Sequence, residues 1–558
     1  MLQRIQNFIL RLKWYLLVIA LTVPTFTVLL RPGYFPMHDD ISVFRIYEMG
    51  LCFKDGQIPC RWIPDMGYRY GYPQFEYYGP LPYYVMTAAN LLGVSLFGAV
   101  KLGFILPMIF GGVTMFLLAA SLFGNWGGLL SAIAYTYLPF RASDIYSRGA
   151  MGETWAFVFI PLILFALLKL YQRPNLKTSA LLALAYAALL TTHNITTLIF
   201  SPLVGLTALL LLIGKRNKLI IIKYGFLALL WSILAAGFFF LPLLFEQGYA
   251  HTKSLISGYF NYLAHFVSLK QLFFTTFWGY GSSEIGPTDD LPFFVGPVHL
   301  FLAIIAGFVA GRNYITKKPD LKQGLVILSF IFVLVSLFLT HERSSFIWES
   351  LPFLAYLQFP WRFLITANFF IALMAGYIVI NLSEKAAKIT LVVFGFLLIF
   401  MNVSYFRPRL WLDLTIWEKF SGVSWDRQLT TSIFDYLPIY AKYPPAAPAP
   451  IFPYAINGKV SFLDYIHQTD SFSFTTKGNS GVTLVLPQYD FPGWQVNLDG
   501  KKISHRHDNP LGLISFEIPA GEHRVRAKLT NTPIRLFGNL ATLLAVPFAI
   551  YTLTKKRK

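Results

Sequence analysis

Leu102-Gly-Phe-Ile-Leu-Pro-Met-Ile-Phe-Gly-Gly-Val-Thr-Met-Phe-Leu-Leu-Ala-Ala-Ser-Leu-Phe123 contains no charged side chain. A helix of this length crosses the ~30 Å hydrocarbon core of a bilayer, which takes about 20 residues. Similar stretches recur through the 558 residues, of which 55% are hydrophobic and 13% are charged. Soluble domains carry about 25% charged residues. Since this chain has too few charges to cover soluble domains, the sequence predicts an integral membrane protein.

We expect twelve full spans, with both termini in the cytoplasm. The spans cover residues 13–31, 102–123, 126–140, 153–171, 178–193, 195–213, 219–244, 296–311, 323–340, 362–382, 388–405 and 535–553. The apolar stretch 81–99 is expected to be re-entrant or interfacial, because only two crossings fit between residues 81 and 140. Its opening prolines, Pro80 and Pro82, and its tyrosines also suit an interface.

The distribution of basic residues predicts the orientation of these spans. The short segments 1–13, 169–177, 215–223, 312–322, 384–388 and 555–558 hold 20 of the 46 Lys and Arg residues. Their only acidic residues are Asp320 and Glu384. The positive-inside rule places short loops rich in Lys and Arg on the cytoplasmic side of the membrane. These segments are therefore expected in the cytoplasm. The net charge of +19 is thus explained by topology, and we expect no nucleic-acid partner.

Three regions follow from this topology. Residues 1–406 form a transmembrane domain, whose first external loop is 32–101. Residues 407–533 form an extracytoplasmic β-rich domain, because runs such as 481–487 and 513–519 alternate apolar and polar residues between turns such as Asp499-Gly500. We expect a small antiparallel β-sandwich there. Residues 534–558 form a last transmembrane helix and a basic cytoplasmic tail.

The first external loop holds the densest group of chemically useful residues. His38-Asp39-Asp40 follows the first span. Adjacent carboxylates can ligate a cation or act as a general base, although a solvated acidic pair is the alternative. Cys52 and Cys60 lie in the same loop, where an oxidising location would allow a disulfide; two independent thiols are the other possibility.

Arginines lie at the outer ends of later spans. Arg362, in Gln358-Phe-Pro-Trp-Arg-Phe-Leu364, carries a fork of donors that matches a phosphate, although it could also be an interfacial anchor. Arg141 and Arg148 could bind phosphate too, or could pair with Asp144 or Glu153.

These motifs together resemble the GT-C superfamily of membrane glycosyltransferases. The resemblance extends from the Asp39-Asp40 pair through Gly56-Gln-Ile-Pro59 and Gly71-Tyr-Pro73 to the Tyr77–Tyr84 run. Arg148-Gly-Ala-Met-Gly-Glu153 is similar to the second acidic motif of oligosaccharyltransferases, but Met151 stands where those enzymes have another acid. Phe491–Gly500 and Pro519–His523 resemble YfhO-like bacterial membrane proteins.

The resemblance implies an inverting glycosyltransferase of the hexosyl- or pentosyltransferase class, acting on the outer face of the cytoplasmic membrane. Its donor would be a polyprenyl-phosphate-linked sugar in the membrane lipid, and its acceptor a glycan, a glycolipid or a protein. The catalytic carboxylate is Asp40 or Asp39. The donor phosphate is expected on Arg362, Arg148 and Arg141.

Other candidates for the site are His38, Glu153, His193 and Glu284. His193 could instead be a hydrogen-bonded interfacial residue. The cofactor is left open; a divalent metal ion is one candidate, with Asp39, Asp40 and Glu153 as its candidate ligands. The competing functions are a transporter or flippase of lipid-linked sugars and a non-catalytic membrane scaffold that presents the β domain.

The charge distribution generates a test of topology. A single cysteine at position 216 should be protected from a membrane-impermeant thiol reagent in intact cells, because segment 215–223 faces the cytoplasm. A single cysteine in the exposed turns of 407–531 should be labelled under the same conditions. The opposite pattern would reverse the predicted orientation.

Overall fold

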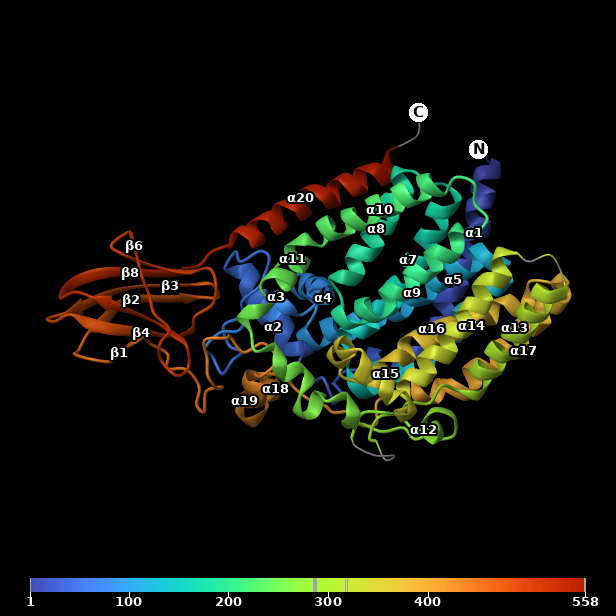
Figure 1. Cartoon of the computed structure of the whole chain (residues 1–558). Coiled ribbons are helices and arrows are strands. Elements are labelled where there is room, and N and C mark those ends of the chain that lie inside the picture. The colour runs from blue at the N-terminus through green and yellow to red at the C-terminus, as the bar shows by residue number, and fades with distance from the viewer. Residues whose placement is uncertain (1, 285–288, 317, 319, 556–558) are drawn as a thin grey trace.

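The computed structural model describes residues 2–284, 289–316, 318 and 320–555, and it consists of a helical body with a β domain projecting from one end (Figure 1). The membrane-protein class is confirmed, because nine helices within the described residues are long and apolar enough to cross a membrane. They are α5 (Leu96–Thr136), α7 (Met151–Gln172), α9 (Asn194–Leu212), α10 (Lys218–Ala235), α13 (Pro297–Thr316), α14 (Leu321–Thr340), the stretch Pro360–Val379 with α16 (Leu364–Ala375) at its centre, α17 (Glu384–Asn402) and α20 (Pro533–Thr554).

The helix α5 is a hairpin rather than one long rod. Gly124, with φ 77° and ψ 174°, interrupts the helical backbone. A Cβ added to Gly128 would lie 2.7 Å from the Ala120 Cβ, and one added to Gly112 would lie 3.0 Å from the Thr136 hydroxyl. These residues meet only if the two limbs lie side by side. The separate stretches expected at 102–123 and 126–140 are therefore two antiparallel limbs that reverse at Gly124.

Shorter apolar helices complete the body. They are α1 (Leu2–Thr22), whose apolar part continues to Thr25, and α8 (Leu176–Leu190), while α11 (Gly237–Phe245) continues the direction begun by α10. Each expected span has a helical counterpart, but the number of crossings and their orientation stay predictions. The helix α4 (Leu81–Leu91) is too short to cross a bilayer, and the re-entrant placement of 81–99 also stays a prediction. Residues 556–558 of the expected tail lie outside the described residues.

The β domain contains two antiparallel sheets that share one core. One sheet has the order β1-β4-β7 and the other β2-β3-β8-β5-β6. The strands are β1 (Tyr454–Ala455), β2 (Ser461–Gln468), β3 (Ser471–Gly478), β4 (Val482–Tyr489), β5 (Trp494–Leu498), β6 (Lys501–Ile503), β7 (Leu513–Ile518) and β8 (Gly521–Leu529). Phe472, Phe474 and Val525 of one sheet pack with Leu484 and Phe516 of the other. This confirms the expected C-terminal β domain.

Two short helices precede the strands and pack on the first external loop. They are α18 (Ile416–Lys419) and α19 (Gly422–Thr430). Tyr34 pairs with Leu412 through two backbone hydrogen bonds of 2.8 and 2.7 Å. The Phe420 ring meets the Tyr47 ring of α2 (Ser42–Lys54) edge-on. The chain after residue 407 therefore covers the loop before it enters the β domain, and the domain boundary expected at 407 stays a prediction.

The first external loop is also held from within. A disulfide joins Cys52 and Cys60, whose Cα atoms lie 5.5 Å apart, so the disulfide prediction is confirmed. The loop includes α3 (Gln74–Tyr77), whose Tyr77 hydroxyl donates to the Glu246 carbonyl at 2.7 Å. The remaining short helices of the outer segments are α6 (Pro139–Ser143), α12 (Leu269–Phe273) and α15 (Ser345–Ser350).

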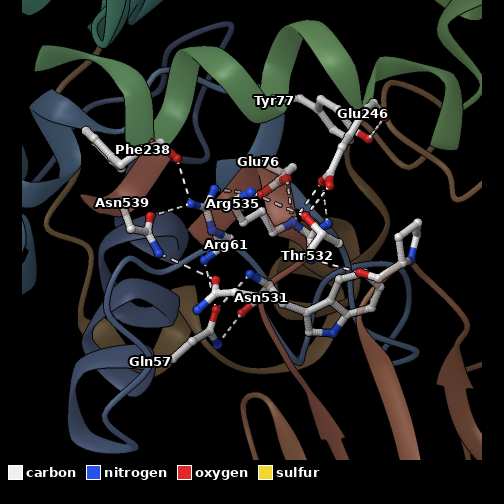
Figure 2. A network of polar contacts seen from close by, with 12 residues as sticks. Gln57, Arg61, Glu76, Tyr77, Phe238, Glu246, Asn531, Thr532, Arg535 and Asn539 are labelled. Atoms are coloured by element: carbon white, nitrogen blue, oxygen red, sulfur yellow. Dashed lines mark hydrogen bonds and ion pairs between the residues drawn. The ribbon is translucent and has the colours of Figure 1, made fainter. Parts of the chain in front are cut away.

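A buried ionic junction joins this loop to α20 (Figure 2). Glu76 accepts from Arg61 Nη1 at 2.9 Å and from Arg535 Nε at 2.9 Å. Arg535 Nε also lies 2.8 Å from Glu246 Oε2, and Thr532 Oγ1 donates to the other Glu246 oxygen at 2.5 Å. The side chains of Glu76 and Arg535 are each 1% exposed. The junction therefore fixes the last helix against residues from the start of the chain.

The two carboxylates of the junction are not equivalent. Glu76 faces two guanidinium groups, and although burial opposes them, their charges lower its pKa to about 2. Glu246 faces one guanidinium group; burial and the neighbouring Glu76 raise its pKa to about 7. Glu76 thus carries the negative charge at neutral pH. When the pair binds a proton, the proton is on Glu246.

This asymmetry predicts different costs for two matched substitutions. Glu76→Gln leaves buried arginine charge without a counterion and should lower the free energy of unfolding by about 3–5 kcal/mol. Glu246→Gln replaces a group that is already close to neutral, and we expect a cost of about 1 kcal/mol. Thermal unfolding of the detergent-solubilised protein at pH 7 compares the two. Equal losses would contradict the assignment of the charge to Glu76.

Candidate functional site

Three helix ends and the first external loop meet at one group of polar residues. Glu153 lies in the first turn of α7, His193 precedes α9, and Arg362 lies in the 3-10 turn before α16. His193 is placed by its own helix, because its ring accepts from the Thr196 amide at 3.3 Å as an N-cap. The sequence-predicted residues Glu153, His193, Arg148 and Arg362 are therefore brought together.

Glu153 is the centre of this group. Its carboxylate accepts from Arg148 Nη1 at 2.5 Å, from Arg148 Nη2 at 3.2 Å and from Arg362 Nε at 3.0 Å. His193 Nε2 lies 4.0 Å from the same carboxylate. The Glu153 side chain is only 3% exposed, so its charge depends on these partners.

The two arginines are held in different ways. Arg148 also pairs with Asp144, and its guanidinium lies 4.3 Å above the centre of the Trp361 ring. Arg362 Nη1 donates to the Leu357 carbonyl and to Gln358 Oε1, each at 2.7 Å. Among the described residues, no acceptor is hydrogen-bonded to Arg362 Nη2. Arg362 therefore keeps a donor for a ligand.

A glycine brings the first loop to this group. Gly149 ends the turn 144–148 with φ 69°, and a Cβ there would lie 2.3 Å from Met37 Sδ. This close approach allows the His38 amide to donate to the Ser147 carbonyl at 3.0 Å and the Asp39 amide to donate to the Arg148 carbonyl at 2.7 Å. The Asp39 backbone is thus attached to the segment that carries Arg148.

The Asp39 carboxylate remains accessible. Its side chain is 47% exposed and its Oδ1 lies 3.2 Å from His38 Nδ1. Burial acts to raise the pKa of Asp39, but the contact with His38 and the charge of Arg148 outweigh it, so the pKa lies below its ordinary value. Asp39 is therefore an ionised, accessible acceptor beside the arginine cluster.

Asp40 has a different environment from its neighbour. Its Oδ2 accepts from Lys419 Nζ of α18 at 2.7 Å, and its Oδ1 is buried without a hydrogen-bond partner among the described residues. Burial raises the pKa of Asp40 although Lys419 opposes this. Asp40 therefore attaches the first loop to the segment that follows the transmembrane body.

The other two predicted residues make no hydrogen bond or ion pair with Glu153, His193, Arg148 or Arg362 among the described residues. Arg141 donates to the Pro107 and Met108 carbonyls at 2.5 and 3.1 Å, within the α5 hairpin. Gly111 leaves room for it, because a Cβ there would lie 2.6 Å from Arg141 Nη2. Glu284 is exposed, and its amide donates to Asp289 Oδ1 at 2.8 Å.

Several residues of the site were not predicted. Lys419 holds Asp40, and the guanidinium of Arg45 lies 4.0 Å from the centre of the Tyr78 ring beside the first loop. His265 Nδ1 and Trp361 Nε1 lie 3.0 and 3.2 Å from the Ser283 hydroxyl. Arg45 carried a signal, since it is a cation in the first turn of the helix that follows the two aspartates. No feature of the sequence around Lys419 indicated its contact with Asp40.

The candidate metal ligands do not fit a shared ion. Both oxygens of Glu153 already accept from guanidinium groups, and Asp40 faces the Lys419 ammonium. No group of three or more His, Cys, Asp or Glu side chains able to hold a metal ion occurs in the part of the chain that the structure describes. Asp39 alone offers an accessible carboxylate, which is too few ligands for a divalent cation.

The Asp40–Lys419 contact generates a prediction. Asp40→Asn leaves a nearly buried ammonium without its counterion, so the free energy of unfolding should fall by about 1–3 kcal/mol. Lys419→Met should cost a similar amount, and the double variant should recover most of the loss. Thermal unfolding of the four proteins completes the cycle. Additive losses would contradict a direct pair.

The chain matches one protein family and one bacterial relative over more than half of its length. Residues 75–408 match the family described as "6-pyruvoyl-tetrahydropterin synthase related domain; membrane protein". An uncharacterized protein of Lactococcus lactis subsp. cremoris (strain MG1363) is 24% identical over 332 residues, which is 58% of this chain and 53% of that protein. The alignment thus spans about half the length of this relative.

Two kinds of solved structure are similar to parts of the chain. The match with arabinofuranosyltransferase AftD from mycobacteria covers 72% of this chain and 28% of the AftD chain, with 15% identity and a TM-score of 0.47. The match with the Archaeoglobus fulgidus oligosaccharyltransferase in its apo form covers 80% of this chain and 62% of that chain, with 10% identity and a TM-score of 0.44. The family match covers more than half of the chain, so this protein belongs to the 6-pyruvoyl-tetrahydropterin synthase-related family of membrane proteins.

Proposed function

We propose that this protein is a membrane glycosyltransferase. It moves a sugar, with inversion, from a polyprenyl-phosphate donor to a glycan, glycolipid or protein acceptor on the outer face of the cytoplasmic membrane. The observation that carries the proposal is the accessible Asp39 carboxylate attached to the segment of Arg148, in one group with Arg362. A base and an anion-binding site are the two parts that this reaction needs.

The arginines suit the leaving phosphate. Arg362 has an unused Nη2 group for a phosphate oxygen, while its Nε and Nη1 donors hold the guanidinium in place on Glu153, Leu357 and Gln358. Glu153 keeps Arg148 and Arg362 together when no ligand is bound, because two buried guanidinium groups repel each other without a carboxylate between them. A donor phosphate would accept from the unused Nη2 donor of Arg362.

Asp39 is the base in this proposal, and Asp40 is its structural neighbour. Asp39 takes the proton of an acceptor hydroxyl, and that oxygen forms a bond to the anomeric carbon of the donor sugar. The bond from this carbon to the phosphate oxygen breaks, and polyprenyl phosphate leaves with both electrons. The low pKa of Asp39 depends partly on Arg148, so a bound phosphate that offsets this charge makes Asp39 a stronger base.

The first test removes the base. Asp39→Asn keeps the shape of the side chain but cannot take a proton, so turnover should fall by about 10²–10⁴-fold with donor binding retained. The measurement is release of polyprenyl phosphate from the lipid-linked sugar that co-purifies with the wild-type protein. The matched control is the double variant Asp40→Asn/Lys419→Met, which should keep most of the turnover. Unchanged transfer by Asp39→Asn would reject the mechanism, and continued translocation of the lipid-linked sugar would favour a flippase.

The second test concerns the phosphate site. Arg362→Lys replaces a fork of donors by a point charge, so donor binding should weaken by about tenfold and turnover should fall with it. Arg141→Lys is the control, because Arg141 contacts helix carbonyls and should affect thermal stability but not donor affinity. Wild-type donor binding by Arg362→Lys would contradict the phosphate role.

A further inference from the structure

The outer face of the five-stranded sheet carries a row of cations. On β8 the residues alternate, with Val525 and Ala527 buried in the core and Arg524, Arg526 and Lys528 on the opposite face. The strand pairing places Asn497 of β5 between Arg526 and Lys502 of β6. We name Lys502, Arg524, Arg526 and Lys528 the cationic face.

These four cations differ from the other charges of the β domain. Lys477 pairs with Glu522, Arg506 with Glu517, and His523 with Asp499. Within residues 2–284, 289–316, 318 and 320–555, no ion pair involves a member of the cationic face. Glu522 is the one acid at the register positions of this face, and it is already paired. Asp470 lies close enough to Lys528 for their charges to interact, whereas Lys502, Arg524 and Arg526 have no ion-pair partner among the described residues.

The surroundings of the cationic face are hydroxyl and amide side chains. Ser471, Ser473 and Thr475 of β3 lie opposite Lys528, Arg526 and Arg524 in the strand register. Gln495 and Asn497 of β5 lie opposite Lys528 and Arg526 on the other side. Such groups donate to and accept from sugar hydroxyls. The edge strand β2 adds exposed Leu463 and Ile466, which can contact the apolar faces of sugar rings.

We propose that the cationic face binds an anionic glycan, a polysaccharide that carries phosphate or carboxylate groups. Alternate residues of a strand are about 7 Å apart, so the three cations of β8 form a line that follows an extended chain with regularly spaced anions. The β domain projects from one end of the helical body (Figure 1), and the side chains of Lys502, Arg524 and Arg526 are exposed. The inference does not depend on the proposed transferase activity.

The test measures binding of the full-length, detergent-solubilised protein to immobilised polysaccharides. Polygalacturonate is the carboxylate probe, a phosphomannan is the phosphate probe, and dextran is the neutral reference. We expect binding to at least one anionic probe, no binding to dextran, and weaker binding as salt rises. Arg524→Gln/Arg526→Gln should lower the affinity by about tenfold, since it removes two adjacent charge contacts.

A matched variant separates a specific face from net charge. Lys459→Gln/Arg506→Gln removes the same charge from other exposed positions of the β domain and should bind like wild type. If Arg524→Gln/Arg526→Gln unfolds at a lower temperature than wild type, Lys502→Gln/Lys528→Gln replaces it with the same expected loss. Equal losses in the control variant, or no binding to either anionic probe, would overturn the proposal. Binding to phosphatidylglycerol vesicles but to neither polysaccharide would overturn it in favour of a lipid surface.

Discussion

Two arginine charges share one nearly buried carboxylate, and the candidate site is arranged around that contact. Glu153 lies at the start of α7, Arg148 reaches it from the turn just before this helix, and Arg362 reaches it from the turn before α16. Charges at this depth are stable only when they are paired. Since Glu153 has both partners, the ends of three helices are drawn to one place, and the first loop attaches there through backbone hydrogen bonds to residues 147 and 148.

The sequence predicted the parts of the fold that depend on local patterns. Apolar length located the helices, including the two limbs that reverse at Gly124. Alternation located β4 and β7, and the Asp499-Gly500 turn lies between β5 and β6, with both residues at positive φ. Two cysteines eight residues apart were close enough to pair. In each case the signal lies within a short stretch, so no knowledge of tertiary contacts was needed.

The sequence could not predict contacts between distant charges. Asp39 and Asp40 are indistinguishable by type, yet one is accessible and the other pairs with Lys419, 379 residues away. Arg141 and Arg148 both follow a span, but Arg141 donates to the Pro107 and Met108 carbonyls of α5, whereas Arg148 faces Glu153. The pairing of each charge is decided by which helices pack together, and hydropathy does not contain this information. The same is true of the junction of Arg61, Glu76, Glu246 and Arg535.

That junction also has a consequence for the order of assembly. Glu76 and Arg535 are 459 residues apart, so the contact forms only after residue 535 has been synthesised and α20 has packed against the first loop. Until then Glu76 has Arg61 as its partner but lacks Arg535, and the loop is held by one cation instead of two. The backbone carbonyl of Tyr77, the residue after Glu76, accepts a hydrogen bond from the Asn194 side chain. Asn194 directly follows His193 in the chain. A chain that ends before Arg535 therefore lacks this contact to the segment that adjoins the site.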